Sequence, residues 1–192
     1  MIAKVLNKQK IEDVVYVYKD VTPNLPKIFL AGPTKRDWYH DKDSWRYEAC
    51  NLLDENGFNG YVFIPENDKK DTFDSSEEGL KSQHVWEWTC MNESDAIMFW
   101  IPRDIENDMP AFTTNVEFGY CLGSFLRKNV IYGRPDTAEK CEYLDDLYNA
   151  TIGKRYNNTL EKTVCAAIHL IEERERKYER HLFENLRRSN RV

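Results

Sequence analysis

Four short apolar runs, each ended by proline or glycine, constrain the fold of this chain more than any other feature. They are KIFLAGP (27–33), YVFIP (61–65), DAIMFWIP (95–102) and NVIYG (129–133). Runs of this length that end in a turn residue are typical of buried strands in a parallel sheet. Segments with helical spacing separate them, so the sequence predicts alternating strands and helices, the pattern of a doubly wound α/β fold.

The segments between these strands have apolar residues at helical spacing. Ser44 is the predicted N-cap of a helix that Gly57 ends. A second helix is predicted over about residues 79–93. A third is expected to begin at Thr114, because a threonine three residues before Glu117 is a candidate capping box.

The two ends of the chain complete the predicted organisation. Residues 12–18 have the β-branched and aromatic composition of an edge strand. A short helix is expected over 137–149, and Asn158 with Glu161 is a candidate capping box for a long C-terminal helix. Beyond about residue 172 that helix is almost wholly charged, so its end is expected to project or to pack on another subunit. The prediction is one domain over 1–192, with an N-terminal extension (1–26), a core (27–135) and a helical C-terminal part (136–192).

The composition argues against several classes of protein. The 192 residues are 41% hydrophobic and 31% charged, with a formal net charge of -6, whereas proteins that bind duplex DNA cluster Lys and Arg. No apolar run approaches the roughly 20 residues that span a bilayer, and the first residues lack the features of a signal peptide. Five scattered cysteines without a C-x-x-C pair favour a reducing cytoplasm over disulfides or a zinc site. We expect no metal and no cofactor.

Ligands of a doubly wound sheet bind outside the carboxyl ends of its strands. The loop after the first strand lacks the glycine patterns of dinucleotide sites and P-loops, which disfavours both kinds of enzyme. Gly32 would let a ligand approach the backbone closely, and Glu66 would stand at the mouth of the site. The arginines in this region could bind a phosphate, and an indole could stack on a base. The alternative for each of these residues is a role in the scaffold or on the surface. The candidate contacts at these strand ends are Gly32, Pro33, Thr34, Arg36, Trp45, Arg46 and Glu66.

Two glutamates are candidates for acid–base or nucleophilic chemistry. Glu87 lies between Trp86 and Trp88, where aromatic neighbours would raise its pKa as a general acid requires. The alternative is a helix glutamate that faces solvent. Glu117 follows the third strand and opens a helix, whose dipole would stabilise the ionised form of a nucleophile, or it only caps that helix. Asp95 starts its strand at the opposite edge, which indicates a structural role.

The order and spacing of KIFLAGPT, YVFIP, SDAIMFWIPRD and TTNVEFGYCLG resemble the nucleoside 2-deoxyribosyltransferase-like family over roughly residues 27–135. The resemblance implies a flavodoxin-like fold with about five mostly parallel strands, helices on both faces, and cleavage or exchange of N-glycosidic bonds. It gives Glu117 the role of the nucleophile that attacks C1′ of the deoxyribose. It gives Glu87, eight residues before Asp95, the role of the carboxylate that handles the proton of the base.

The chain departs from the family pattern at two places. The tyrosine that often steadies the nucleophile from the first strand has no counterpart, since Ile28 and Phe29 stand there. The aspartate that commonly binds the sugar six residues before the nucleophile is replaced by Ala111, and Asp108 or Asn115 could substitute for it. A 5′-phosphate could be held by Arg36, Arg46 or Arg103.

The sequence therefore predicts a cytoplasmic enzyme that acts on a nucleoside or nucleotide, with a free nucleobase as a further substrate in the transfer reaction. The mechanism implied is two-step and retaining. Hydrolysis of the same bond, in a nucleotide or an NAD-like dinucleotide, is one alternative. A non-catalytic nucleotide-binding sensor or interaction module is another. Because sites of the family are often completed by a neighbouring subunit, we expect a homodimer or higher homo-oligomer, and neither duplex nucleic acid nor a membrane as a partner.

Overall fold

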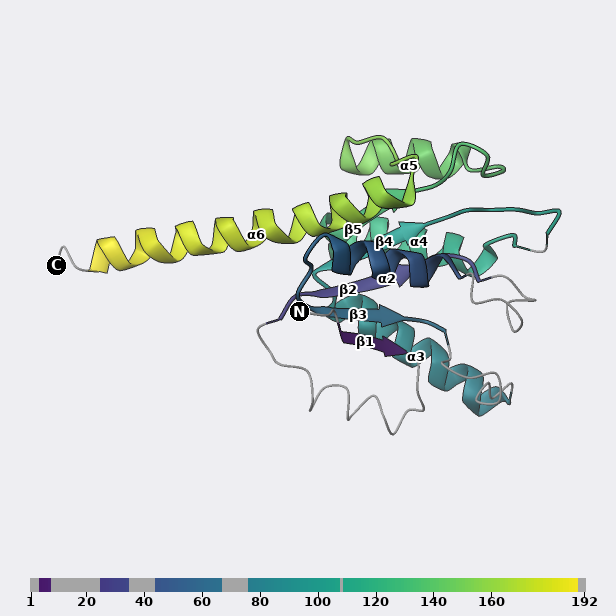
Figure 1. Ribbon diagram of the computed structural model, residues 1–192, viewed down its shortest axis with the longest axis horizontal. Helices are drawn as coiled ribbons and strands as arrows, with labels where there is room; N and C mark the ends of the chain where they lie inside the picture. The colour runs from purple at the N-terminus through teal and green to yellow at the C-terminus, as the bar shows by residue number, and fades with distance from the viewer. Residues whose placement is uncertain (1–3, 8–24, 35–43, 67–75, 108, 190–192) are drawn as a thin grey trace.

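A computed structural model describes residues 4–7, 25–34, 44–66, 76–107 and 109–189. Its centre is a five-stranded sheet in which every neighbouring pair is parallel, in the order β1-β3-β2-β4-β5 (Figure 1). The strands are β1 (Lys4–Asn7), β2 (Lys27–Ala31), β3 (Tyr61–Ile64), β4 (Ala96–Trp100) and β5 (Val130–Gly133). The predicted doubly wound α/β fold is confirmed.

The fifth strand is one that the sequence did not indicate. The predicted strand over 12–18 lies outside the described residues, and the edge of the sheet is formed by β1, which pairs Lys4 with Tyr61. The run KVLN is short and half polar, so its composition does not mark it as a strand. Backbone pairing with the open edge of β3 defines it, and that pairing is not visible in local sequence.

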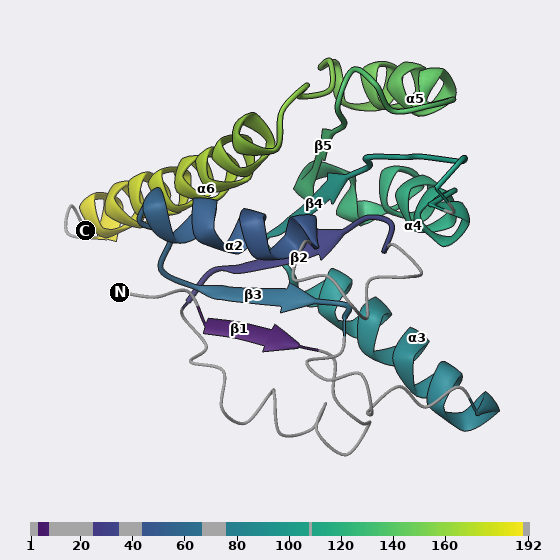
Figure 2. The same cartoon turned by 45° about the vertical axis from the view of Figure 1, so that its right-hand side comes forward.

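Helices cover both faces of the sheet (Figure 2). One face carries α2 (Trp45–Glu55) and α6 (Leu160–Ser189), and the other carries α3 (Glu77–Glu93), α4 (Phe112–Gly123) and α5 (Glu142–Ile152). A 3-10 turn, η3 (Phe125–Asn129), precedes β5. In the described part of the chain, no helix is both long enough and apolar enough to cross a membrane.

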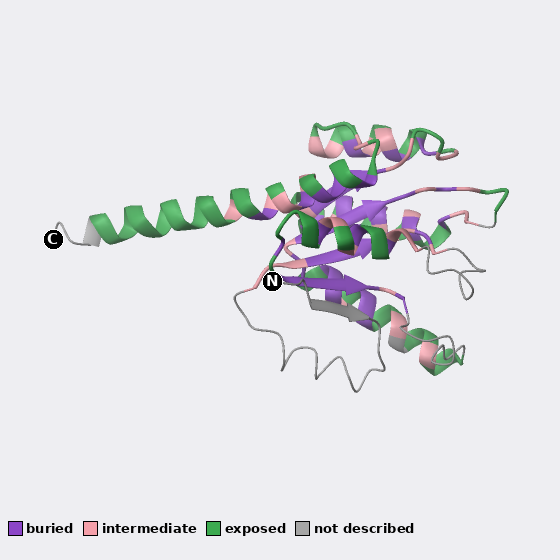
Figure 3. Cartoon of the chain, in the orientation of Figure 1, coloured by how far each residue is buried: buried purple, intermediate pink, exposed green. Residues whose placement is uncertain are grey.

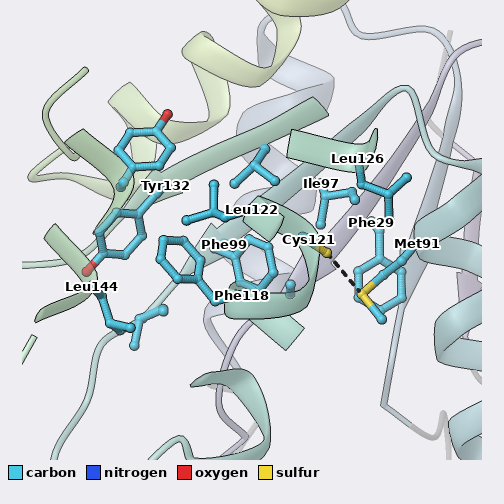
Figure 4. Close-up of a cluster of buried hydrophobic side chains, with 14 of the residues drawn as sticks. Phe29, Met91, Ile97, Phe99, Phe118, Cys121, Leu122, Leu126, Tyr132 and Leu144 are labelled. Atoms are coloured by element: carbon cyan, nitrogen blue, oxygen red, sulfur yellow. Dashed lines mark hydrogen bonds between the residues drawn. The ribbon is translucent and has the colours of Figure 1, made fainter. Parts of the chain in front are cut away.

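Strands β2, β3, β4 and β5 are buried on both faces, and alternate side chains enter two cores (Figure 3). Ile28 and Leu30 face α2 and α6, whereas Phe29 faces α3 and α4. The second core contains several aromatic rings: the ring of Phe118 on α4 lies 5.0 Å from that of Phe99 on β4, in an edge-to-face contact (Figure 4). This packing holds α4 against the sheet at the residue next to Glu117.

The beginnings of the last two helices differ from the prediction. Thr159, not Asn158, caps α6, since its hydroxyl accepts a hydrogen bond from the Lys162 N–H at 3.2 Å. The side-chain amide of Asn158 instead donates to Asp136 at 3.3 Å. The helix expected over 137–149 begins later, at Glu142, because the preceding residues form turns.

The topology places a switch point between β2 and β4. These strands are neighbours, but the chain leaves β2 towards α2 on one face and leaves β4 towards α4 on the other. Such a divergence is the switch point at which doubly wound folds bind ligands. The residues to consider for a site therefore lie at the carboxyl ends of β2, β3 and β4.

Candidate active site

Helix α4 carries Glu117 in its second turn rather than at its end. The helix begins at Phe112, directly after Ala111, whose backbone is left-handed with φ of 60°. Glu117 is therefore the sixth residue of the helix, and no side chain caps the first turn. The predicted capping box of Thr114 and Glu117 is wrong, because the chain enters the helix three residues before Thr114. The interpretation of Glu117 as only a cap is thus excluded.

Helix α3 buries Glu87 beside the sheet. Trp86 anchors this part of the helix, with its ring 6.2 Å from that of Phe63, and Glu87 itself is only 6% exposed. Gln83, one turn earlier, donates a hydrogen bond from Nε2 to the Glu87 carboxylate at 2.7 Å. The solvent-facing alternative for Glu87 is therefore wrong. Trp88, the second indole expected beside Glu87, is 56% exposed, so it is Trp86 that contributes to the core.

The two glutamates are close enough to interact electrostatically. Burial, and then the charge of Glu87, raise the pKa of Glu117 from 4.5 to about 8, while Arg46 opposes this rise. The prediction that α4 stabilises ionised Glu117 is therefore wrong. The carboxyl group lies beyond the first turn, where the helix dipole acts, and it lies near another carboxylate. At neutral pH Glu117 therefore holds its proton, beside the carboxyl group of Glu87.

The guanidinium of Arg46 is the centre of a buried network at the ends of β2 and β3. Its Nε donates to the Leu30 carbonyl at 3.1 Å and its Nη2 to the Gly32 carbonyl at 2.6 Å. Its Nη1 donates to the Thr34 hydroxyl at 3.1 Å and to Glu66 at 2.5 Å. The protein thus occupies four of the five N–H groups of a side chain that is 1% exposed. This arrangement favours a positioning role for Arg46 over the predicted contact with a substrate phosphate.

Glu66 is the acidic partner in this network, and one of its oxygens is already in use. Oε1 accepts hydrogen bonds from the hydroxyls of Thr34, at 3.3 Å, and Ser44, at 3.0 Å, in addition to Arg46. Oε2 is buried and has no hydrogen-bond partner among the described residues. An unpaired carboxylate oxygen is costly to bury, so this oxygen is an acceptor that a donor group of a ligand could satisfy. It supports the predicted contact of Glu66 with a substrate.

Gly32 is required by packing at the end of β2. Its φ is +152°, and a Cβ there would lie 2.1 Å from the Trp100 carbonyl oxygen and 2.8 Å from the Trp45 ring. The Trp45 indole donates to the Pro33 carbonyl at 3.0 Å, and the Arg46 guanidinium lies 4.5 Å from the centre of its ring. The close approach that we predicted for a ligand is thus made by the protein itself.

We expect Gly32→Ala to lower the free energy of unfolding by about 2–4 kcal/mol, because the added Cβ meets backbone atoms and the φ disfavours an L side chain. Urea unfolding measures this change. Gly119→Ala is the matched control, because a Cβ at that helical glycine has no atom within 4 Å. An unchanged midpoint for Gly32→Ala would contradict the packing described above.

Arg103 and Asn115 contact each other at the end of β4. The Nη2 of Arg103 donates to the Asn115 side-chain oxygen, and its Nη1 donates to the Lys140 carbonyl at 2.6 Å. Arg103 is 7% exposed, and its Nε has no hydrogen-bond partner among the described residues. The pair ties the second turn of α4 to the loop before α5. The roles of both residues in substrate binding stay predictions.

Of the remaining predicted residues, Arg36 and Asp108 lie outside the described part of the chain. Asp95 has the structural role that the sequence indicated. Its carboxylate accepts a hydrogen bond from the Lys27 N–H, and its own N–H donates to the Lys27 carbonyl, both at 2.9 Å. These bonds join the beginnings of β2 and β4, at the edge opposite the carboxyl ends of the strands.

Sequence reasoning missed the two residues that hold the buried carboxylates. Gln83 lies one helical turn before Glu87, and this four-residue spacing on a predicted helix could have identified it. Ser44 caps α2 as predicted, but its hydroxyl also donates to Glu66, 22 residues along the chain. No local signal connects Ser44 with Glu66, because the contact exists only once β2 and β3 pair.

Comparison with known proteins identifies the family. Residues 25–137 match the family described as nucleoside 2-deoxyribosyltransferase like, and no curated protein matches the chain. The matched segment begins just before β2, ends just after β5 and includes Glu87 and Glu117. It covers more than half of the 192 residues. The chain therefore belongs to the nucleoside 2-deoxyribosyltransferase-like family.

Proposed function

We propose that the protein cleaves or exchanges the N-glycosidic bond of a nucleoside or nucleotide through a covalent glycosyl–glutamate intermediate. Membership of the family implies a small-molecule nucleoside substrate. The observation that supports this chemistry most is the electrostatic interaction of Glu117 on α4 with Glu87 on α3. Two carboxyl groups that hold one proton can supply an acid and a nucleophile at the same time.

In the proposed first step, a Glu117 carboxylate oxygen attacks C1′ of the sugar while the bond from C1′ to the base nitrogen breaks. The electrons of that bond go to the base, which takes the proton of Glu87. The products are a glycosyl ester of Glu117 and a free base. The step requires that Glu87 holds the shared proton and that Glu117 is ionised, which is one of the two arrangements open to the pair.

In the proposed second step, a nucleophile attacks C1′ and releases Glu117 as a carboxylate. A nitrogen of a second base gives a new nucleoside, and a water molecule gives the free sugar. In both cases the proton that the nucleophile loses goes to Glu87, which restores the starting state. Two successive inversions retain the configuration at C1′.

Incubation with a deoxynucleoside and a different free base tests the proposal and separates its alternatives. Exchanged nucleoside identifies a transferase, and free sugar with free base identifies a hydrolase. A non-catalytic sensor would show ligand protection against thermal unfolding without either product. Running the incubation with the 5′-monophosphate as well decides between nucleoside and nucleotide substrates.

We expect kcat/KM to be nearly constant in the neutral range and to fall as the pH rises through about 8. The cause is the raised pKa of Glu117, since the carboxyl pair loses its last proton near that pH and then has no acid to protonate the base. A pH–rate profile under subsaturating substrate measures this. A profile that instead rises through pH 8 would mean that Glu117 must lose its proton before it can react, which contradicts the shared proton.

A further inference from the structure

Three buried side-chain atoms have no hydrogen-bond partner in the part of the chain that the structure describes: Glu66 Oε2, Trp86 Nε1 and Arg103 Nε. The Trp86 ring lies in the core, against Phe29 and Phe63. Glu66 and Arg103 instead follow the ends of β3 and β4, at the edge where doubly wound sheets bind ligands. Arg103 Nε is one of five N–H groups, whereas Glu66 Oε2 is one of only two carboxylate oxygens. Glu66 therefore gives the stronger indication of a ligand.

The contacts of Glu66 leave one of its oxygens with three donors and the other with none. Arg46 Nη1 and the hydroxyls of Thr34 and Ser44 all donate to Oε1. A guanidinium frequently bonds both oxygens of a carboxylate in parallel. Here the second group, Nη2, donates to the Gly32 carbonyl at 2.6 Å instead. The main chain at the end of β2 thus takes the donor that Oε2 lacks, in a side chain that is only 2% exposed.

The ion pair of Arg46 and Glu66 lies near the proposed nucleophile. Strands β2 and β3 are paired and parallel, so the residues that follow them meet at one edge of the sheet (Figure 2). The charge of Arg46 opposes the rise in the pKa of Glu117, so this guanidinium is within electrostatic reach of that carboxyl group. A nucleoside whose C1′ meets Glu117 would therefore lie partly beside the ion pair.

We propose that Glu66 is a specificity-determining residue, whose Oε2 accepts a hydrogen bond from an N–H or O–H group of the substrate. An ionised carboxylate is only an acceptor, so the group that meets it is a donor. It repels the oxygens of a phosphate, so the 5′-phosphate of a nucleotide would lie elsewhere. A nucleoside has two kinds of donor, the hydroxyls of its sugar and the N–H groups of its base. The inference rests on the proposed function for the kind of ligand, but not for the chemistry at Glu117.

Calorimetric binding of the natural deoxynucleosides and their 5′-monophosphates tests the inference. The measurements use the Glu117→Gln protein, so that no ligand is consumed. Each ligand is compared with analogues that lack a sugar hydroxyl and with an analogue whose base donors are deleted or methylated. We expect one kind of deletion to weaken binding by about 10–100-fold, because the buried acceptor then stays unpaired. The kind of deletion that does so identifies the partner of Glu66 as a hydroxyl or as a base N–H.

Adding Glu66→Gln assigns this effect to Oε2. The amide oxygen can keep the hydrogen bonds of Oε1, while an NH₂ group, which is a donor, replaces Oε2. The loss of affinity caused by the deleted donor should then disappear. Glu48→Gln is the matched control, because it neutralises an exposed glutamate in the first turn of α2 and should preserve the full loss. If Glu66→Gln does not fold, Arg46→Met combined with Glu66→Leu removes the same oxygen without leaving a buried charge.

Equal affinity for the analogues and their parent ligands, or a loss that Glu66→Gln leaves unchanged, would overturn the inference. So would a protein that binds none of these ligands. Failure of the proposed function gives a different result: the wild type would form neither exchanged nucleoside nor free sugar, while the loss of affinity that depends on Glu66 would persist.

Discussion

Glu117→Gln should reduce turnover by roughly 10³-fold or more, because the amide keeps the shape of the side chain but cannot form the glycosyl ester. Glu87→Gln should also be severely impaired with natural nucleosides. It should recover much of its activity with a deoxyriboside whose leaving group is an acidic phenol, since such a group departs without a proton. Steady-state kinetics of both variants with both substrates measures these differences.

The selective recovery of Glu87→Gln separates an acid from a nucleophile. If Glu117→Gln were equally active with the phenolic substrate, the proposed roles of the two residues would be wrong. If both variants turned over natural nucleosides like the wild type, the proposed mechanism would fail altogether. Thermal unfolding detects a loss of activity that is caused by misfolding. For Glu117→Gln, the direction of the change in Tm can be predicted.

Glu117→Gln should be more stable than the wild type at alkaline pH. The folded protein holds the Glu117 proton until about pH 8, whereas the unfolded chain releases it near pH 4.5. Rising pH between these values therefore destabilises the wild type, and the variant does not titrate at this position. The Tm of the variant minus that of the wild type should grow up to about pH 8 and then stay constant. Each kcal/mol of difference in the free energy of unfolding corresponds to about 2–4 °C. A difference that does not change with pH would contradict the raised pKa.

The second large effect is expected from the buried ion pair at the ends of β2 and β3. Glu66→Ala should lower the free energy of unfolding by about 3–5 kcal/mol, because it leaves the Arg46 guanidinium charged, buried and without its anion. This corresponds to a decrease in Tm on the order of 10 °C. Differential scanning calorimetry measures it.

Two controls test whether the pairing itself causes this loss. Glu48→Ala removes an exposed glutamate from the same end of α2 and should change stability by less than about 0.5 kcal/mol. Arg46→Met combined with Glu66→Leu removes both charges and should recover part of the loss. A Glu66→Ala variant as stable as Glu48→Ala would show that the network contributes little to the fold.

Much of the fold follows from local sequence, because each core strand is an apolar run closed by proline or glycine. The edge strand Lys4–Asn7 does not follow, since it is specified by pairing with β3 rather than by its own composition. The start of α4 does not follow either. The TTNVE sequence has a good capping pattern, but the left-handed backbone of Ala111 begins the helix before that pattern can form.

The candidate site was likewise only partly predictable from the sequence. Glu87 and Glu117 could be selected from their positions relative to the strands and from the family resemblance. The surroundings of these two residues could not be predicted from the sequence, since the raised pKa of Glu117 depends on how two helices lie against the sheet. Arg46 looked available to a phosphate in the sequence, but long-range contacts with Glu66 and the end of β2 occupy it.

The central claim is that Glu117 forms a covalent bond with the sugar. The most direct measurement is to denature the wild type during turnover of a deoxynucleoside without an acceptor base, digest it, and find the modified residue by mass spectrometry. We expect a deoxyribosyl group on the peptide that contains Glu117, and its loss when an acceptor base is added before denaturation. Turnover without an adduct on Glu117, or with the sugar on another residue, would contradict the mechanism.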